Sequence, residues 1–273
     1  MTSPSVIAPG SPAAAPWPVV LVHGTRTSHS QWDRQLPALR AAGHRVLTPD
    51  LPGHGTRRGE PFALDPALST IRDAVCGAAG GSGLPVHLVG SSLGGMLAIR
   101  AAALLTEESA RPLGSLTVCG GAVQPTPATA RAYGRLIRLT DHLPGTGDGR
   151  FFRLLLGPDG ARAYLRGGRA DVDVVRPAME AVASLDLLAD LHRIPVPVTF
   201  LHGRFDQLRL QERAFALAAA RGRLELLPSG THLVNLTAPS RFTPVLLRVL
   251  ARAECEGRES RPARRSPRRG GAP

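Results

Sequence analysis

One segment of the sequence combines the residues that nucleophilic catalysis needs in a suitable local order. Residues 86–96 read VHLVGSSLGGM, an apolar run followed by G-x-S-x-G and then by an apolar, helix-forming stretch. This pattern predicts a nucleophile elbow, a tight strand-to-helix turn that presents the hydroxyl of Ser92. Gly90 and Gly94 lie two residues before and after Ser92, where a Cβ atom would collide across the turn. The helix that begins after Ser92 would place a backbone N–H and a positive dipole end beside the nucleophile.

Four further segments agree with this interpretation in order and spacing. They read VVLVHGT at 19–25, DLPGHG at 50–55, FLHGRFD at 200–206 and SGTH at 229–232. Together with the elbow, they resemble the α/β-hydrolase family over roughly residues 17–250. The resemblance implies an α/β fold with a mostly parallel central sheet flanked by helices. It also implies a serine hydrolase that works without a cofactor.

The resemblance assigns three side chains to a catalytic triad, in the chain order Ser92, Asp206, His232. A serine hydroxyl is a weak nucleophile at neutral pH, so a base must take its proton during attack. Imidazole has an ordinary pKa of about 6.5, which suits this role. We therefore expect His232 to be the base and Asp206 to orient its ring. The backbone N–H groups of Thr25 and Leu93 would form the oxyanion hole.

Other side chains could compete for these roles on sequence grounds alone. Alternatives to Asp206 are the aspartates of the 122–193 stretch, namely Asp148, Asp159, Asp171, Asp173, Asp186 and Asp190. We expect His23 to shape the oxyanion turn and His54 to be structural. The remaining histidines show no spacing typical of paired metal ligands, so no metal site is predicted. They are His29, His44, His87, His142, His192 and His202.

Short apolar runs alternate with longer amphipathic segments, a pattern typical of βαβ units and a parallel sheet. Strands are predicted at 18–22, 45–48, 86–89, 116–119, 196–201 and 224–227. Helices are predicted at 31–42, 67–79, 93–105, 211–220 and 239–253. The family's fold usually begins with an antiparallel strand pair. The Pro-rich residues 1–16 make a poor hairpin, so we expect this N-terminal strand pair to be truncated.

Residues 122–193 interrupt the alternation. Two predicted strands are here separated by about 70 residues, far more than a simple crossover needs. The stretch predicts a helical cap inserted over one end of the sheet, with residues 17–121 and 194–253 forming the hydrolase core. Phe151 and Phe152 are candidates for lining an apolar acyl pocket. Residues 1–16 and the Arg-rich residues 254–273 are predicted to be a disordered leader and tail.

The composition argues against a nucleic-acid-binding or membrane-spanning protein. The formal net charge of +12 comes from arginine alone and forms no dense patch outside the C-terminal tail. Aromatic residues make up only 4%, which leaves few platforms for stacking bases. No apolar run approaches the roughly 20 residues that span a bilayer, and the N-terminus lacks the features of a secretory signal. The three separated cysteines predict neither disulfides nor a zinc site, and Cys119 is expected to be buried. A cytoplasmic location is expected.

The leading hypothesis is hydrolysis of a small, apolar carboxylic ester or lactone through an acyl-enzyme on Ser92. The same triad also serves thioesterases, amidases, C–C bond hydrolases and perhydrolase-type haloperoxidases, so these remain open. Two hypotheses lie outside hydrolysis: a catalytically silent hydrolase fold used for binding, and an RNA- or anion-associated protein acting through its tail. The expected partner is a small-molecule ester rather than a specific nucleic acid, and the oligomeric state is not predicted.

Overall fold

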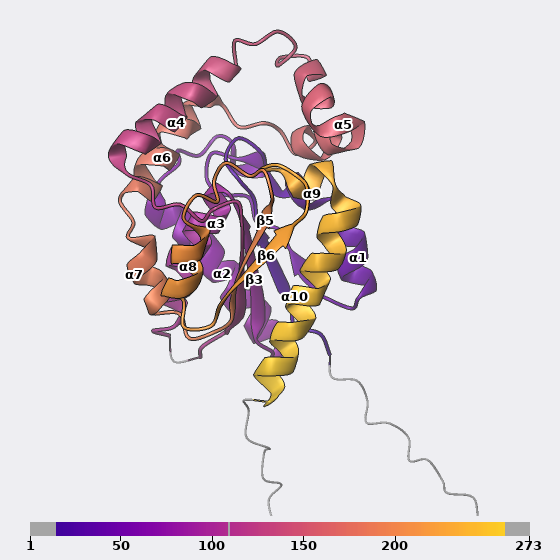
Figure 1. Ribbon diagram of the computed structural model, residues 1–273, viewed down its shortest axis with the longest axis vertical. Coiled ribbons are helices and arrows are strands. Elements are labelled where there is room, and N and C mark those ends of the chain that lie inside the picture. The colour runs from indigo at the N-terminus through magenta and orange to yellow at the C-terminus, as the bar shows by residue number, and fades with distance from the viewer. Residues whose placement is uncertain (1–14, 109, 260–273) are drawn as a thin grey trace, which may run out of the picture.

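A six-stranded, all-parallel sheet forms the centre of the molecule in the computed structural model, which describes residues 15–108 and 110–259 (Figure 1). The strand order is β2-β1-β3-β4-β5-β6. Each predicted strand is present, with bounds that differ by a few residues. They are β1 Val19–Val22, β2 Val46–Leu47, β3 Val86–Ser91, β4 Leu113–Cys119, β5 Val198–Gly203 and β6 Gly222–Leu227. Within the described residues no strand precedes β1, and because most of the segment that could hold an N-terminal strand pair lies outside them, its truncation stays a prediction.

Helices cover both faces of the sheet, as expected for strands whose side chains are apolar in both directions. One face carries α2 (Leu64–Ser82), α3 (Leu93–Leu105), α7 (Leu187–His192) and α8 (Glu212–Ala218). The other face carries α1 (Leu36–Ala41) and α10 (Pro239–Glu259), and the short helix α9 (Val234–Thr237) precedes α10 (Figure 1). None of the described helices is both long enough and apolar enough to cross a membrane.

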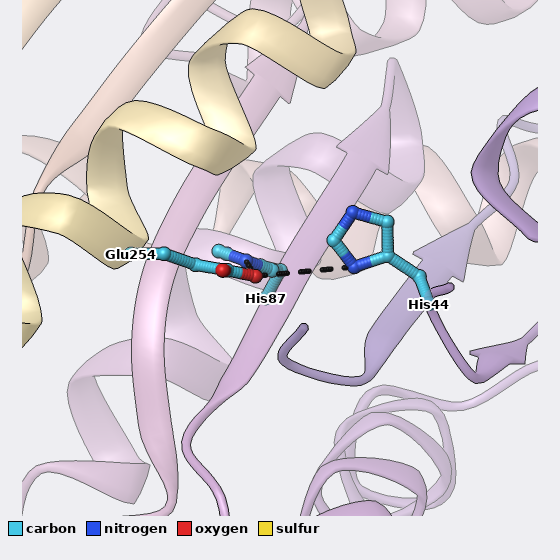
Figure 2. Close-up of side chains that lie close together, drawn as sticks. All are labelled: His44, His87 and Glu254. Atoms are coloured by element: carbon cyan, nitrogen blue, oxygen red, sulfur yellow. Dashed lines mark hydrogen bonds and ion pairs between the residues drawn. The ribbon is translucent and has the colours of Figure 1, made fainter. Parts of the chain in front are cut away.

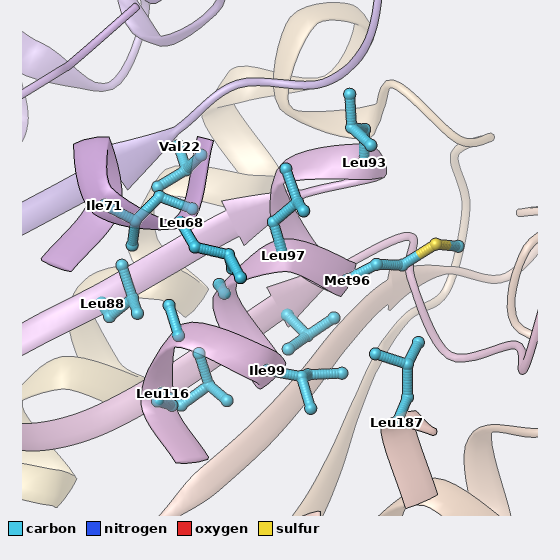
Figure 3. Close-up of a cluster of buried hydrophobic side chains, with 14 of the residues drawn as sticks. Val22, Leu68, Ile71, Leu88, Leu93, Met96, Leu97, Ile99, Leu116 and Leu187 are labelled. Carbon is cyan, nitrogen blue, oxygen red and sulfur yellow. The ribbon is translucent and has the colours of Figure 1, made fainter. Parts of the chain in front are cut away.

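The larger core cluster fixes α3 against the sheet (Figure 3). Leu97 and Ile99 of α3 are fully buried, and Leu88 of β3 and Leu116 of β4 lie in the same cluster. A helix that is apolar around its whole circumference is stable only when it is enclosed, which accounts for the burial of nearly all of α3. Because α3 cannot shift without disrupting this packing, its first residue is held firmly at the end of β3.

The cap is formed by three helices that lie over the carboxyl ends of the strands (Figure 1). They are α4 (Pro127–Thr140), α5 (Arg150–Leu165) and α6 (Val175–Ala183). Helices α4 and α6 pack on each other, whereas α5 contacts α9. The last helix of the predicted 122–193 insertion, α7, instead packs on α3 and α8, so it covers the sheet.

Among the helices, two differences from the sequence prediction bear on the site and on the C-terminal segment. The single helix predicted over 31–42 is divided into a 3-10 turn at His29–Trp32 and α1, which begins with a proline in its first turn. The last helix, α10, extends to Glu259, so residues 254–259 are helical and not part of a disordered tail. The predicted leader up to residue 14 and the predicted tail from residue 260 lie outside the described residues.

Candidate active site

Ser92 occupies a strained turn between β3 and α3. Its φ of 54° and ψ of −120° are rare for a residue with a side chain. Backbone strain of this kind is found most often at functional sites. The Ser92 N–H donates to the carbonyl oxygen of Cys119, at a distance of 2.8 Å. A Cβ at Gly90 would lie 2.3 Å from the Gly94 oxygen, and one at Gly94 would lie 2.3 Å from the His23 oxygen. The turn therefore requires both glycines, for the steric reason expected from the motif.

His232 and Asp206 form a hydrogen-bonded pair near the carboxyl ends of β5 and β6. His232 Nδ1 donates to Asp206 Oδ1 at 2.9 Å, and the N–H of Leu208 donates to the same oxygen at 2.8 Å. Burial raises the pKa of the Asp206 carboxyl, but the hydrogen bond and charge of His232, the Leu208 N–H and the charge of His202 together lower it more, so the net pKa lies below its usual value. The aspartate is therefore ionised at neutral pH, and it orients the imidazole with Nε2 available for a second partner.

The loop after β4 lies between this pair and Ser92. A Cβ at Gly120 would be 2.7 Å from His232 Nδ1 and 2.8 Å from Asp206 Oδ2. A Cβ at the next residue, Gly121, would be 3.3 Å from the carbonyl oxygen of Ser92. Ser92 and the His232–Asp206 pair thus border the same two-glycine loop. Among the described residues no hydrogen bond joins Ser92 to His232, so the structure pairs two of the three candidate residues directly.

The candidate oxyanion loop follows β1 and approaches the elbow closely. A Cβ at Gly24 would lie 3.3 Å from the Cβ of Ser92, so Thr25 follows directly after the point of closest approach. Leu93 is 1% exposed and is the first residue of α3. Within the described part of the chain, the N–H groups of Thr25 and Leu93 have no protein acceptor. Both are thus free to donate to a developing oxyanion.

Gln31 is a residue of the candidate site that no pattern in the sequence predicted. Its side chain is fully buried; its Oε1 accepts from the Gly24 N–H at 2.8 Å, and its Nε2 donates to Ser91 Oγ at 2.9 Å. Its carbonyl oxygen accepts from Asn235 Nδ2 at 3.2 Å. Gln31 therefore connects the oxyanion loop, the elbow and the segment that follows His232. Only the fold brings these segments together, so spacing along the chain could not reveal the role.

Two buried histidines, His23 and His202, are neutral and hold loops of the site in place. His23 Nδ1 donates to the Gly24 oxygen at 2.8 Å and its Nε2 accepts from the Leu51 N–H at 3.0 Å, which joins the oxyanion loop to the DLPGHG loop. Burial lowers the pKa of His23 to about 3. His202 Nδ1 accepts from the Gly120 N–H at 3.1 Å, and burial lowers its pKa to about 4. Both imidazoles are loop supports at neutral pH.

The cap is attached to the oxyanion loop by an ionic cluster. Arg26, which has a φ of 62° and is 5% exposed, donates to Asp141 at the end of α4. Arg169 donates to the other oxygen of Asp141. Thr27 Oγ1 adds a hydrogen bond of 3.0 Å to the Tyr164 carbonyl oxygen of α5. The residue after the candidate oxyanion donor therefore contacts the cap directly.

The two phenylalanines predicted for an acyl pocket both belong to α5. Phe152 is 6% exposed, stacks on Tyr164 and lies under the guanidinium of Arg169, 4.8 Å from its ring centroid. Phe151 is half-buried and meets Phe152 edge-on. Both rings thus pack in an apolar cluster that α5 forms with Leu233 and Leu236 at α9. A role in binding an acyl chain stays a prediction.

A second group of polar side chains, His44, His87 and Glu254, gathers at the opposite end of the sheet (Figure 2). Glu254 Oε1 accepts from the Trp17 N–H at 2.8 Å and lies 3.3 Å from His87 Nε2. His44 Nδ1 donates to the Trp17 carbonyl oxygen at 2.8 Å, so this nitrogen is not available as a metal ligand. These three side chains connect α10 to β3. Because a ring nitrogen of His44 already donates to a carbonyl oxygen, the group does not favour a metal site.

Similarity to known proteins agrees with the fold. The model of a family described as the alpha/beta hydrolase family matches residues 19–245. The chain therefore belongs to the alpha/beta hydrolase family. This confirms both the fold class and the prediction of an enzyme of the hydrolase type.

Individual relatives cover most of the chain. A pimeloyl-[acyl-carrier protein] methyl ester esterase from Methylococcus capsulatus is 33% identical over 219 residues, which are 73% of this chain and 80% of the relative. A solved thermophilic esterase from Thermogutta terrifontis has a TM-score of 0.68 at 21% identity, over 88% of this chain and 91% of its own. A bromoperoxidase from Bacillus anthracis has a TM-score of 0.68 at 23% identity, over 87% and 92%. The two structures support the fold.

Proposed function

We propose that the protein hydrolyses carboxylic esters or lactones of small, apolar acids through an acyl-enzyme. The observation that carries the proposal is a strained serine at a nucleophile elbow, together with a hydrogen-bonded His232–Asp206 pair at the same edge of the sheet. The M. capsulatus relative, named as a methyl ester esterase, supports an ester as substrate. The expected partner is thus a small-molecule ester.

The proposed mechanism uses only groups of the chain. His232 Nε2 takes the Ser92 proton as Oγ attacks the ester carbonyl, and Asp206 stabilises the imidazolium that forms. The N–H groups of Thr25 and Leu93 donate to the oxyanion, and one such donor is typically worth about 10²–10³ in rate. His232 then returns the proton to the departing alcohol. Water, deprotonated by His232, releases the acid from Ser92.

During catalysis the Ser92 hydroxyl would have to donate to His232 Nε2, a hydrogen bond that is absent among the described residues. Catalytic hydrogen bonds are often long in the free enzyme and tighten once substrate is bound. The Ser92 hydroxyl must therefore react although, among the described residues, it makes no hydrogen bond to His232. Labelling of that hydroxyl by a fluorophosphonate tests this requirement directly.

The experiment compares the unmodified protein with Ser92→Ala and Ser91→Ala. Turnover of 4-nitrophenyl acetate, butyrate and octanoate is measured, together with fluorophosphonate labelling, because either serine of the GSSLG sequence could be labelled in principle. We expect Ser92→Ala to lose labelling and at least 10³-fold in kcat, whereas Ser91→Ala retains labelling. Equal turnover by the Ser92→Ala protein and the unmodified one would refute the proposal.

A substrate panel addresses the alternatives that share this triad. Methyl esters, lactones, thioesters, a β-diketone and a peracid-forming assay with acetate and hydrogen peroxide are compared by kcat/KM. We expect carboxylic esters to give the highest value. A β-diketone or peroxide reaction that exceeds ester hydrolysis would reassign the activity to a C–C hydrolase or a perhydrolase.

A further inference from the structure

A groove runs along the outer side of the cap between α4 and α6. Its volume is about 410 Å³, which is within the range of roughly 300–1,000 Å³ found for small-molecule sites. Gly134 of α4 lies opposite Val175 of α6, and a Cβ at Gly134 would be 3.8 Å from the Val175 side chain. None of the residues proposed for catalysis lines the groove.

The rim of the groove carries an excess of positive charge. Arg131, Arg135 and Arg138 lie at spacings of four and three along α4 and therefore on one side of that helix. Within the described residues, these three form no ion pair. The fourth arginine, Arg176 of α6, pairs with Glu180 at 2.8 Å, and Glu180 is the one carboxylate of the lining. The rim thus has a net charge of +3 without a protein anion to balance it.

The floor of the groove is apolar. Ala130 of α4 and Met179 of α6 are 5% and 8% exposed, and Ala183 stands beside them. A bare inorganic anion would satisfy the arginines and leave this floor in water. A neutral alkyl compound would cover the floor and leave the charge unbalanced. An anion with an alkyl chain would balance the charge of the arginines and cover the apolar floor. A carboxylate suits the charged end, since guanidinium groups bind carboxylates through paired hydrogen bonds.

We propose that this α4–α6 groove is a binding site for medium-chain carboxylates, with the chain on the apolar floor and the carboxylate among Arg131, Arg135 and Arg138. The site is distinct from the one proposed for catalysis, and the inference does not depend on the triad. A carboxylic acid is also the product class of the proposed reaction, so the groove could hold product outside the catalytic site.

The test is calorimetric titration of the full-length Ser92→Ala protein with sodium decanoate. The groove variant combines Arg131→Gln, Arg135→Gln and Arg138→Gln. The matched control combines Arg40→Gln, Arg213→Gln and Arg248→Gln, which are exposed arginines away from the groove that form no ion pair within the described residues. We expect the groove variant to raise the decanoate Kd at least tenfold and the control to leave it within twofold. Equal Kd values for the two variants would overturn the proposal.

Two further arms separate the contributions of charge and chain. Decanol and butyrate should each bind at least tenfold more weakly than decanoate, since one lacks the charge and the other lacks most of the chain. Ala183→Phe, which fills the groove while keeping every arginine, should also weaken decanoate binding at least tenfold. Unchanged binding to Ala183→Phe would place the ligand elsewhere, and decanol binding as tightly as decanoate would exclude a role for the arginines. Either result contradicts the proposal.

Discussion

Gly120 is positioned so that any side chain there would displace the proposed base. It has a φ of 64°, and its Cβ position falls 2.7 Å from His232 and 2.8 Å from Asp206. We expect Gly120→Ala to lower kcat for a nitrophenyl ester about 100-fold, because His232 must move to make room. Gly83→Ala is the control, since Gly83 has a φ of 65° and open space around its Cβ position. The Gly83→Ala protein carries the same backbone strain of about 1–2 kcal/mol but has no clash with His232 or Asp206, so its kcat should be unchanged.

Gln31 acts through the oxyanion loop and is therefore a positioning residue. Gln31→Leu leaves the Gly24 N–H without its acceptor, so the loop that carries Thr25 should shift. We expect kcat to fall about tenfold with little change in KM, because the lost interaction serves the transition state. Gln35→Leu removes an equally buried side chain that donates to Asn235 and has no contact with Gly24. A similar fall in kcat for both variants would show that the effect is general destabilisation.

Some residues of the candidate site can be predicted from sequence motifs, whereas others are identified only from the fold. Ser92, Asp206 and His232 could be proposed from the sequence because each lies in a short segment with a recognisable pattern. The structure adds the bond between His232 and Asp206. Gln31 lies in no such segment, and His202, although it lies in FLHGRFD, was not predicted to support a loop, since the partners of both are backbone groups far away in the chain. Such roles are set by tertiary packing and become visible only in three dimensions.

At the scale of elements, Asp141 holds the cap against the oxyanion loop. Asp141→Asn would leave Arg26 and Arg169 without their shared anion. Loss of a fully buried partner costs about 3–5 kcal/mol, and because the Asp141 side chain is 20% exposed we expect a smaller loss of about 1–3 kcal/mol in unfolding free energy. Tryptic cleavage between α4 and α5 should also accelerate. The Arg58–Asp171 pair is the control.

Asp171→Asn breaks an ion pair of the same chemistry whose aspartate side chain is 71% exposed. We expect it to cost less than about 1 kcal/mol and to leave proteolysis of the cap unchanged. Urea unfolding followed by circular dichroism measures both variants. Equal losses for Asp141→Asn and Asp171→Asn would mean that the cluster at Arg26 is an ordinary surface contact.

The central strands β1, β3, β4 and β5 were predictable because each is a short run that is buried along its whole length. The edge strands β2 and β6 are only partly buried, but each still contains a short apolar run. The boundaries of the helices were less predictable from the sequence. Residues 31–42 have helical periodicity, but a 3-10 turn at His29–Trp32 places Gln31 beside the oxyanion loop, and α1 begins only at Leu36. The charged composition of residues 254–259 suggested a tail, whereas Glu254 accepts from Trp17 and His87 and extends α10. Long-range polar contacts decided both cases.

For the whole molecule, parallel strands bring their carboxyl ends to one edge, and this explains why residues 25, 92, 206 and 232 converge there. The order of the strands follows from tertiary packing, which a single sequence does not display. Convergence also places several histidines in the interior, where the charged form is disfavoured by loss of solvent. The stability of the fold should therefore depend on keeping these side chains neutral.

Acid should weaken the fold in a defined pH window. The pKa of His23 is lowered to about 3 and that of His202 to about 4, so between these values and about 6.5 the unfolded chain binds more protons than the folded one. Unfolding free energy should fall as the pH drops from 6.5 towards 4, by about 1.4 kcal/mol per pH unit for each group. His202→Asn keeps an acceptor for the Gly120 N–H and cannot titrate. The unfolding free energy of this variant, measured with urea, should therefore depend on pH less steeply, by about 1.4 kcal/mol per pH unit. His192→Asn, at an exposed position, should retain the original slope. Identical slopes for His202→Asn and the unmodified protein would show that His202 does not contribute to the acid sensitivity.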